Sequence, residues 1–380
     1  MDDCQAHPSQ RVGFRVPMKI AFLDSWLQSS AQGSGTAVGI GGLEQALRAL
    51  GHEVVRLAPE GDRPANLLLR RLLFNLRLPT LLRRQHYDLI VGFDIDGVFC
   101  SSCDGPTPYV VSVKGVLAEE SLQETGRWRW ILWALSRLER HNVRRAPLVL
   151  TTSRYCGRAI RRHYGVPWQR IRLVPEGINL GRWRRLVQTV PHTSDGATIL
   201  CVARQYRRKH VADLLRAMPL VRRAVPQARA LIVGDGPEHA NLRRLWAELG
   251  LGESVRLLGE VPDDDEVARL YRQADVFCLP SIQEGFGIVF LEAMASGLPV
   301  VATTAAAIPE VVPQGRAGLL VPPGNVEALA AALVELLRDP GRRAACAAFG
   351  QEHVRQYDWP VVATTFLRAV TGAGSRFAEQ

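Results

Sequence analysis

Two successive series of apolar runs, separated by segments of helical spacing, limit this chain to a small set of folds. The first series extends over residues 18–180 and the second over 196–350, with a polar linker at 179–196. Such alternation is typical of parallel sheets covered by helices on both faces. The sequence therefore predicts an α/β protein with two Rossmann-like, doubly wound domains and a cleft between the carboxyl ends of their strands. The expected strands are 18–23, 52–57, 87–93, 109–113 and 148–152 in the first domain, and 198–202, 228–233, 255–258 and 275–279 in the second.

The length of 380 residues supports this division, because it is long for a single hydrophobic core. Residues 351–380 form a third segment of mostly helical character, interrupted at Trp359-Pro360. Seven cysteines are scattered along the chain, and the single CxxC, Cys100 to Cys103, has no second pair or nearby histidine. We expect neither a metal centre nor redox chemistry there.

The chain is basic, with a net charge of +10. This charge admits nucleic acid, an anionic membrane or an anionic substrate as a partner. No nucleic-acid motif is present, so we expect no nucleic-acid partner. Of the 47 basic residues only Lys19, Lys114 and Lys209 are lysines, so a lysine at a given position is informative.

Residues 66–84 combine apolar and basic positions without an acid. They could lie on an anionic membrane surface, but an amphipathic helix packed on the sheet with solvated arginines is the favoured interpretation. No apolar run is long enough to span a membrane, and the first 17 residues lack a signal core. We therefore expect a cytoplasmic protein, with peripheral membrane contact as the alternative.

Two carboxylates eight residues apart, Glu284 and Glu292, mark the candidate site. Glu284 follows an expected strand, and Glu292 lies about two turns into the helix that comes next. Gly285 and Gly287 leave backbone N–H groups free at the start of that helix, where the dipole favours anions. One acid can hold sugar hydroxyls and the other ribose hydroxyls, with a phosphate between them. The pattern alone is weak, because both acids could be surface charges.

Basic and glycine-rich loops add to this site. Arg204 directly follows a strand, and Lys209 stands five residues later where a helix begins, so both can clamp a diphosphate. The alternative is a basic surface loop. In the first domain a glycine-rich loop over 33–42 precedes a helix, and Gly41 and Gly42 there would allow close approach of a phosphate.

These motifs, in this order and spacing, resemble glycosyltransferase family 4, whose members are retaining enzymes of the two-domain GT-B fold. The tail segment 357–359 is similar to the family's segment that crosses back to the first domain. The matching motifs are 204–209, 233–238, 258–262, 284–292, 297–303 and 308–310 in the second domain, and, more loosely, 41–44, 51–54, 152–153 and 175–179 in the first.

The resemblance implies an extended site for a nucleotide-sugar donor. Arg204 and Lys209 would neutralise the leaving diphosphate, Glu284 would hold hydroxyls of the donor sugar, and Glu292 would hold the ribose. The other implied donor-binding positions are Gly41, Gly42, Gly259, Val261, Gly285, Phe286, Gly287 and Ile288.

Lys114 departs from the family pattern. It follows the strand 109–113, where the family often has a histidine that contacts the donor sugar. A lysine here could pair with the diphosphate, bind a different sugar substituent, or be structural.

The reaction implied needs no metal and no cofactor, because preorganised cations and helix-start N–H groups can stabilise the departing diphosphate. No side chain in the matched set is an obvious nucleophile, so we expect front-face attack with retention of anomeric configuration.

The acceptor is predicted from acidic loops of the first domain. Asp94, Asp96, Glu119 and Glu120 would form an acidic lip, which suits a small acceptor rich in hydroxyls or amines, such as an aminocyclitol in antibiotic biosynthesis. Asp94 and Asp96 are not expected to bind metal. Trp128, Trp130 and Trp133 nearby could stack on a sugar ring or cover a lipid. The competing hypothesis is a lipid-linked acceptor held at a membrane by residues 66–84. In other classes, the alternatives are a sugar-nucleotide epimerase or a non-catalytic binding module.

Overall fold

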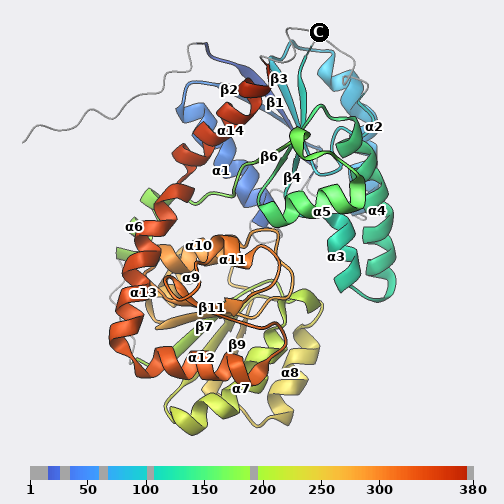
Figure 1. Cartoon of the computed structure of the whole chain (residues 1–380). Coiled ribbons are helices and arrows are strands. Elements are labelled where there is room, and N and C mark those ends of the chain that lie inside the picture. The colour runs from blue at the N-terminus through green and yellow to red at the C-terminus, as the bar shows by residue number, and fades with distance from the viewer. Residues whose placement is uncertain (1–15, 26–34, 60–66, 101–106, 189–195, 375–380) are drawn as a thin grey trace, which may run out of the picture.

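The computed structural model describes residues 16–25, 35–59, 67–100, 107–188 and 196–374. It contains two parallel sheets of six strands each, both covered by helices (Figure 1). The prediction of two doubly wound domains is therefore confirmed. Cys4, Cys103 and Gly33 lie outside the described residues.

The first domain holds β1 (Lys19–Leu23), β2 (Glu53–Leu57), β3 (Leu89–Phe93), β4 (Tyr109–Val113), β5 (Leu148–Thr151) and β6 (Ile171–Leu173). They form one sheet in the order β2-β1-β3-β4-β5-β6. Side chains alternate between its faces, as in β1, where Ile20 and Phe22 join one core cluster and Ala21 and Leu23 join the other.

Helices cover both faces of this sheet. The cluster that contains Phe22 is completed by α1 (Gly35–Ala49) and α14 (Trp359–Gly374). The opposite cluster takes apolar side chains from α2 (Leu67–Leu82), α4 (Gly126–Arg145) and α5 (Arg154–Tyr164). A short helix, α3 (Leu117–Gln123), packs against α4.

The second domain has the strand order β12-β11-β10-β7-β8-β9 around one large core. Its strands are β7 (Thr198–Val202), β8 (Arg229–Val233), β9 (Val255–Gly259), β10 (Val276–Leu279), β11 (Val300–Thr303) and β12 (Gly318–Val321). Its helices are α7 (Val211–Ala224), α8 (His239–Glu248), α9 (Asp264–Arg272), α10 (Ile288–Ala295), α11 (Ile308–Val311), α12 (Val326–Arg338) and α13 (Pro340–His353).

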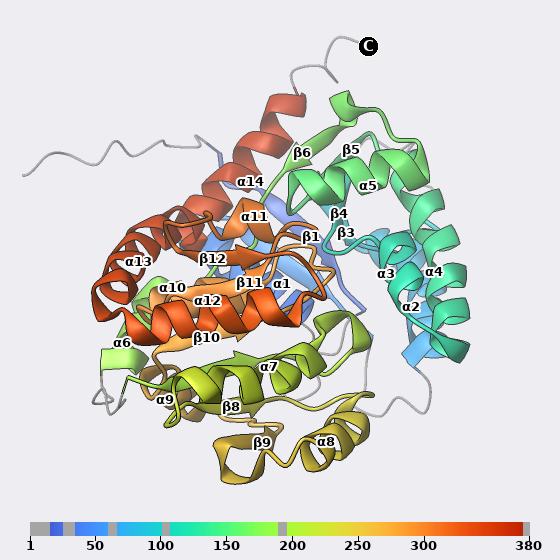
Figure 2. The ribbon, with the colours of Figure 1, turned by 60° about the horizontal axis from the view of Figure 1, so that its bottom comes forward.

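The C-terminal helix returns to the first domain, as predicted. After α13, α14 runs beside α1 in both views (Figures 1 and 2). Gly42 makes this packing possible, since a Cβ on it would lie 2.1 Å from the Trp359 ring. The break expected at Trp359-Pro360 falls at the start of α14.

Three local predictions were wrong. The linker contains a helix, α6 (Leu180–Gln188), whose Leu180 and Val187 are buried, so a short amphipathic helix was missed. Helix α1 begins at Gly35 and includes Gly41 and Gly42, which the sequence placed in a loop. Helix α10 begins at Ile288, so Glu292 lies about one turn into it.

Residues 67–82 form the expected amphipathic helix, α2. Phe74 and Leu78 are buried against the sheet, whereas Leu69, Leu73 and Leu76 are exposed. Within the described residues, no helix combines the length and apolar composition needed to cross a membrane.

Candidate functional site

The candidate site lies where the strand order of the second sheet reverses. Strands β7 and β10 are neighbours there, although the loops that follow them are far apart in the sequence. In doubly wound sheets, ligands bind at the carboxyl ends of the strands at such a switch point. Lys209 follows β7 and Glu284 follows β10, and Lys209 Nζ lies 2.5 Å from Glu284 Oε1.

This ion pair is largely enclosed, with 14% of the Lys209 side chain and 8% of the Glu284 side chain exposed. Ser281 Oγ donates a second hydrogen bond, of 2.9 Å, to Glu284 Oε1. The two loops are also joined by their neighbours, since Ile282 N donates to Arg208 O at 2.9 Å and Arg208 Nε donates to Gln283 Oε1 at 3.0 Å. The site is thus preorganised by contacts between two distant segments.

Arg204 stands at the open side of the same edge. Its guanidinium is 3.6 Å from the carboxylate of Glu260, which follows β9, and its side chain is 43% exposed. The loop that carries Arg204 rests on the glycine turn after β8, where a Cβ on Gly234 would lie 2.0 Å from the carbonyl oxygen of Ala203. Gly259 and Val261 belong to the same edge, so the predicted donor residues after β7, β9 and β10 share one rim.

The start of α10 has the geometry expected of an anion site. Gly287 has φ 93°, and a Cβ there would lie 2.6 Å from the Phe290 ring, so only glycine fits. Phe286 is buried and packs edge-on against Tyr357. The first N–H groups of a helix have no intrahelical partner and point toward an incoming anion.

Glu292 is oriented by a residue that the sequence interpretation missed. Tyr271 Oη donates a 2.9 Å hydrogen bond to Glu292 Oε2. Burial and the charge of Glu292 raise the pKa of Tyr271 well above its usual value, so the hydroxyl remains a donor. Trp183 of α6 donates from Nε1 to the carbonyl oxygen of Glu292 at 3.1 Å. Tyr271 lies 21 residues before Glu292 and belongs to none of the motifs.

Lys114 lies at the junction but is already paired. Its Nζ is 2.8 Å from Glu176 Oε1, and both side chains are 6% exposed. Glu176 Oε2 has no hydrogen-bond partner among the described residues. The carbonyl oxygen of Lys114 faces the second domain, 2.9 Å from where a Cβ on Gly285 would lie. Contact of Lys114 with a donor stays a prediction.

Gly41 and Gly42 differ in their surroundings. Gly42 packs against Trp359 of α14, since a Cβ there would meet the Trp359 ring. A Cβ on Gly41 would meet no heavy atom within 4 Å. Both glycines lie inside helix α1, so their placement in a loop is corrected, and approach of a phosphate to either stays a prediction.

The predicted acidic lip is mostly used inside the first domain. Asp96 is fully buried, and its carboxylate accepts hydrogen bonds from Ser25 and Asn75, with Arg71 at 3.8 Å. Its assignment to the acceptor was wrong, because these side chains fill the switch point between β1 and β3. Asp94 is also buried and accepts from the backbone N of Lys114 at 2.9 Å.

Glu119 is held by α5. It accepts hydrogen bonds from His163, Arg162 and the hydroxyl of Tyr155, so it is not an open lip residue. Glu120 is half-buried, and its negative charge contributes to raising the pKa of Arg208 in the second domain, against the effect of burial. A role of Glu120 in acceptor binding stays a prediction.

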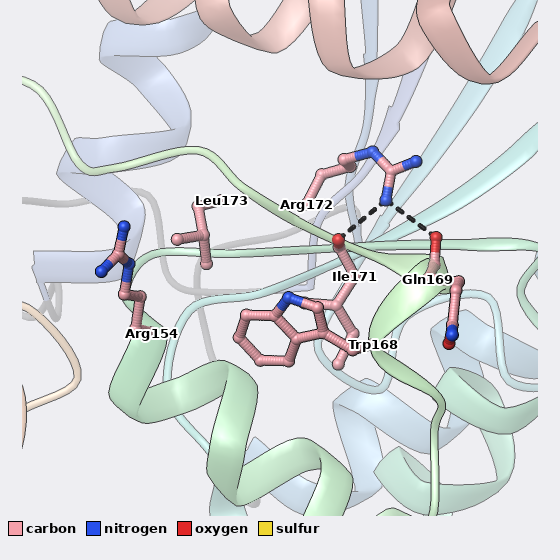
Figure 3. A pocket seen from close by; sticks show the side chains of 6 residues that line it. All are labelled: Arg154, Trp168, Gln169, Ile171, Arg172 and Leu173. Carbon is pink, nitrogen blue, oxygen red and sulfur yellow. Dashed lines mark hydrogen bonds between the residues drawn. The ribbon is translucent and has the colours of Figure 1, made fainter.

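A separate hollow of about 730 Å³ lies beside α5 and the edge strand β6 (Figure 3). Arg172 donates there to the carbonyl oxygens of Gln169 and Ile171. None of the predicted donor residues lines this hollow, whose lining consists of Arg154, Trp168, Gln169, Ile171, Arg172 and Leu173.

Two protein-family models match the chain, one on each domain. The model described as Glycosyltransferase Family 4 matches residues 33–182, and the model described as Glycosyl transferases group 1 matches residues 196–339.

Individual proteins match as well. A GDP-mannose-dependent alpha-(1-6)-phosphatidylinositol monomannoside mannosyltransferase of Mycobacterium tuberculosis is 30% identical over 356 residues, 87% of each chain. A phosphatidyl-myo-inositol mannosyltransferase of Mycobacterium leprae is 41% identical over 208 residues, so this chain matches about half of that protein (54%) and 53% of its own length. The solved sucrose-phosphate synthase of Thermosynechococcus elongatus has a TM-score of 0.77 at 24% identity, covering 96% of this chain and 100% of that one, which shows the shared fold alone.

Proposed function

Because this chain belongs to glycosyltransferase family 4, we propose that it transfers a sugar from a nucleoside-diphosphate sugar to a lipid-borne acceptor at an anionic membrane surface. The relative matched over 87% of its length is named as GDP-mannose-dependent and acts on a phosphatidylinositol mannoside. GDP-mannose is therefore the first donor to test. The small antibiotic-type acceptor finds no support among these relatives.

The proposal that the chain acts at a membrane surface rests on exposed aromatic and basic side chains on α4. Trp128, Trp130 and Trp133 are 50%, 68% and 50% exposed. The guanidinium of Arg127 lies 5.9 Å from the Trp128 ring centroid, and that of Arg137 lies 5.5 Å from the Trp133 ring centroid. Tryptophan is enriched at membrane interfaces, because its ring is apolar and its N–H needs a polar partner.

Helix α2 carries further exposed apolar side chains. Its exposed Leu69, Leu73 and Leu76 recur at helical spacing, and α2 covers the same face of the sheet as α4 (Figure 2). Helix α2 contains no acid, and Glu139, the acid of α4, is buried. Apolar side chains flanked by arginines suit adsorption to anionic lipid.

The donor chemistry follows from the switch-point residues. Lys209 and Arg204 would neutralise the diphosphate, the N–H groups at the start of α10 would bind phosphate oxygens, and Glu284 would hold sugar hydroxyls. We expect transfer without a metal and with retention of configuration. Proton NMR of the product tests retention, and activity in excess EDTA tests metal independence.

Co-sedimentation with vesicles of phosphatidylcholine and phosphatidylinositol tests the membrane part at about 0.15 M salt. We expect the chain to bind, and a variant with Trp128→Ala, Trp130→Ala and Trp133→Ala to lose most binding. Trp168→Ala is the matched control, because Trp168 is 40% exposed outside this surface. Equal binding by all three proteins, or no binding by the native chain, would refute the proposed surface.

Transfer itself is measured as incorporation of labelled mannose from GDP-mannose into the lipid phase. Release of nucleoside diphosphate only when acceptor vesicles are added distinguishes transfer from epimerisation. Incorporation into soluble aminocyclitols but not into lipid would refute the lipid acceptor.

A further inference from the structure

One turn of the first domain makes two separate contacts with the second domain. It comprises residues 152–153, which join β5 to α5 at the carboxyl edge of the first sheet, and the first residues of α5, 154–156. Its hydroxyls meet the loop that carries Glu284, and its backbone N–H groups meet Glu310 of α11.

The contact with the loop converges on the carbonyl oxygen of Gly285. Thr152 Oγ1 donates to it at 3.0 Å and Ser153 Oγ at 2.9 Å. The thiol of Cys156 lies 3.4 Å from the same oxygen. Gly285 lacks a Cβ, and one placed there would be 2.9 Å from the carbonyl oxygen of Lys114, so any side chain would push the two domains apart.

The second contact uses both carboxylate oxygens of Glu310. Oε2 accepts from the backbone N of Arg154 at 2.7 Å, and Oε1 accepts from the backbone N of Tyr155 at 2.8 Å. These are the first two residues of α5, where N–H groups lack intrahelical partners and the helix dipole favours a negative charge. Arg158, one turn further along α5, lies 3.7 Å from Glu310 Oε1.

The two contacts are mechanically linked within the second domain. The residue before α11, Ala307, donates from its backbone N to the carbonyl oxygen of Glu284 at 3.2 Å. Movement of Glu310 away from α5 would therefore pull on the loop that holds Glu284. The Glu310 side chain is 29% exposed, so water can replace the helix N-terminus as its partner when the domains separate.

We propose that Glu310 is a positioning residue that clasps the N-terminus of α5 and so fixes the Glu284 loop in its binding geometry when the domains are closed. The expected effect of Glu310 on sugar transfer rests on the proposed function. Its expected effect on domain closure does not. Glu310 touches no substrate in this scheme, because it acts through the loop of Glu284 and Gly285.

The direct test measures the distance between the domains by single-molecule fluorescence energy transfer, with one dye on each domain. We expect Glu310→Ala to lower the ratio of closed to open molecules about tenfold, equivalent to about 1.4 kcal/mol. Thr152→Val, which removes one hydroxyl bond to Gly285 but leaves the Ser153 cap of α5, should shift the ratio in the same direction. Glu327→Gln is the matched control, because Glu327 lies in the first turn of its own helix, α12.

Kinetics separate positioning from general loss of structure. In Glu310→Ala, kcat/KM for transfer should fall about tenfold while the Kd for nucleoside diphosphate stays within about twofold, because Arg204, Lys209 and Glu292 all belong to the second domain. Unchanged domain distances in both Glu310→Ala and Thr152→Val would overturn the inference. If the native chain transfers no sugar, the proposed function fails. The measured distance between the domains still tests whether the contact of Glu310 with the start of α5 stabilises the closed form.

Discussion

Lys209 Nζ and Glu284 Oε1 lie 2.5 Å apart across the point where the strand order of the second sheet reverses. The two residues are 75 positions apart in the sequence. Their contact places a cation for the diphosphate next to a carboxylate for the sugar, so the two ends of the predicted donor site share one charge pair. Each partner holds the other in place before a ligand arrives.

Replacing Lys209 should separate the diphosphate and sugar functions of this pair. Lys209→Ala removes the partly buried cation that would face the diphosphate, and we expect the affinity of this variant for nucleoside diphosphate to fall at least about tenfold, as for other charge-assisted contacts. Isothermal titration calorimetry with GDP and UDP measures this. Arg207→Ala, an exposed neighbour, is the control. Native affinity in Lys209→Ala would contradict the assignment.

Removing the Tyr271 hydroxyl should weaken the binding of ribose by Glu292, because this hydroxyl orients the Glu292 carboxylate. Tyr271→Phe keeps the stacking on Phe277 but deletes the 2.9 Å bond to Glu292. We expect a loss of about 1 kcal/mol in stability and a several-fold weaker affinity for nucleoside diphosphate. Tyr155→Phe removes a hydroxyl bonded to Glu119 in the first domain and should leave that affinity unchanged. Equal affinities in both variants would show that Tyr271 does not position Glu292.

Glu139 should make stability fall as pH rises. Burial, followed by the charge of Asp94, raises the pKa of Glu139 well above 4.5. Above pH 4.5 the unfolded chain releases this proton while the folded chain keeps it, so the free energy of unfolding falls until the folded pKa is passed. Glu139→Gln removes this penalty, so its free energy of unfolding relative to that of the native chain should rise as the pH rises above 4.5. Thermal unfolding across this range measures the trend.

Glu119 is the control for Glu139, because its pKa is shifted in the opposite direction, and its contribution to stability should therefore change with pH in the opposite sense. Burial would raise the pKa of Glu119, but hydrogen bonds from His163 and Arg162 outweigh it and lower the pKa. Its stabilisation is present above pH 4.5 and is lost as pH falls through the lowered pKa. Glu119→Gln should therefore be less stable than the native chain at pH 7, and the difference should shrink in acid. The same trend in both variants would contradict the assigned pKa directions.

Neighbouring glycines of α1 should respond differently to alanine. Gly42→Ala places a Cβ 2.1 Å from Trp359 and should cost about 1–3 kcal/mol by forcing α14 away from α1. Gly41→Ala meets no atom within 4 Å and should raise stability by up to about 1 kcal/mol through helix propensity. Chemical denaturation measures both. A drop in nucleoside diphosphate affinity in Gly41→Ala, without loss of stability, would support phosphate approach at Gly41.

Several parts of this architecture were predictable because they depend on local patterns. Strand 109–113 was predicted at its observed bounds, since a short valine-rich run between Pro108 and Lys114 is a short-range signal. The glycines at 285 and 287 were expected at the start of a helix, and α10 begins directly after them at Ile288, although Glu292 lies about one turn into it and not two. In contrast, α6 and β6 were missed, because a nine-residue helix and a three-residue edge strand carry little periodicity.

The two doubly wound domains and the second-domain motifs were predictable before folding was considered, because periodicity and motif spacing are properties of contiguous residues. Which side chains meet depended on the folded arrangement of the strands and domains. In the second sheet, the strand order places Lys209 next to Glu284 at the switch point. At the switch point of the first sheet, Asp96 and its hydrogen-bond partners Ser25 and Asn75 occupy the corresponding place. Packing pairs Lys114 with Glu176 in an ion pair, and it places the Glu310 carboxylate against the backbone N–H groups at the start of α5. Such pairings depend on strand order and domain closure, which no local pattern encodes.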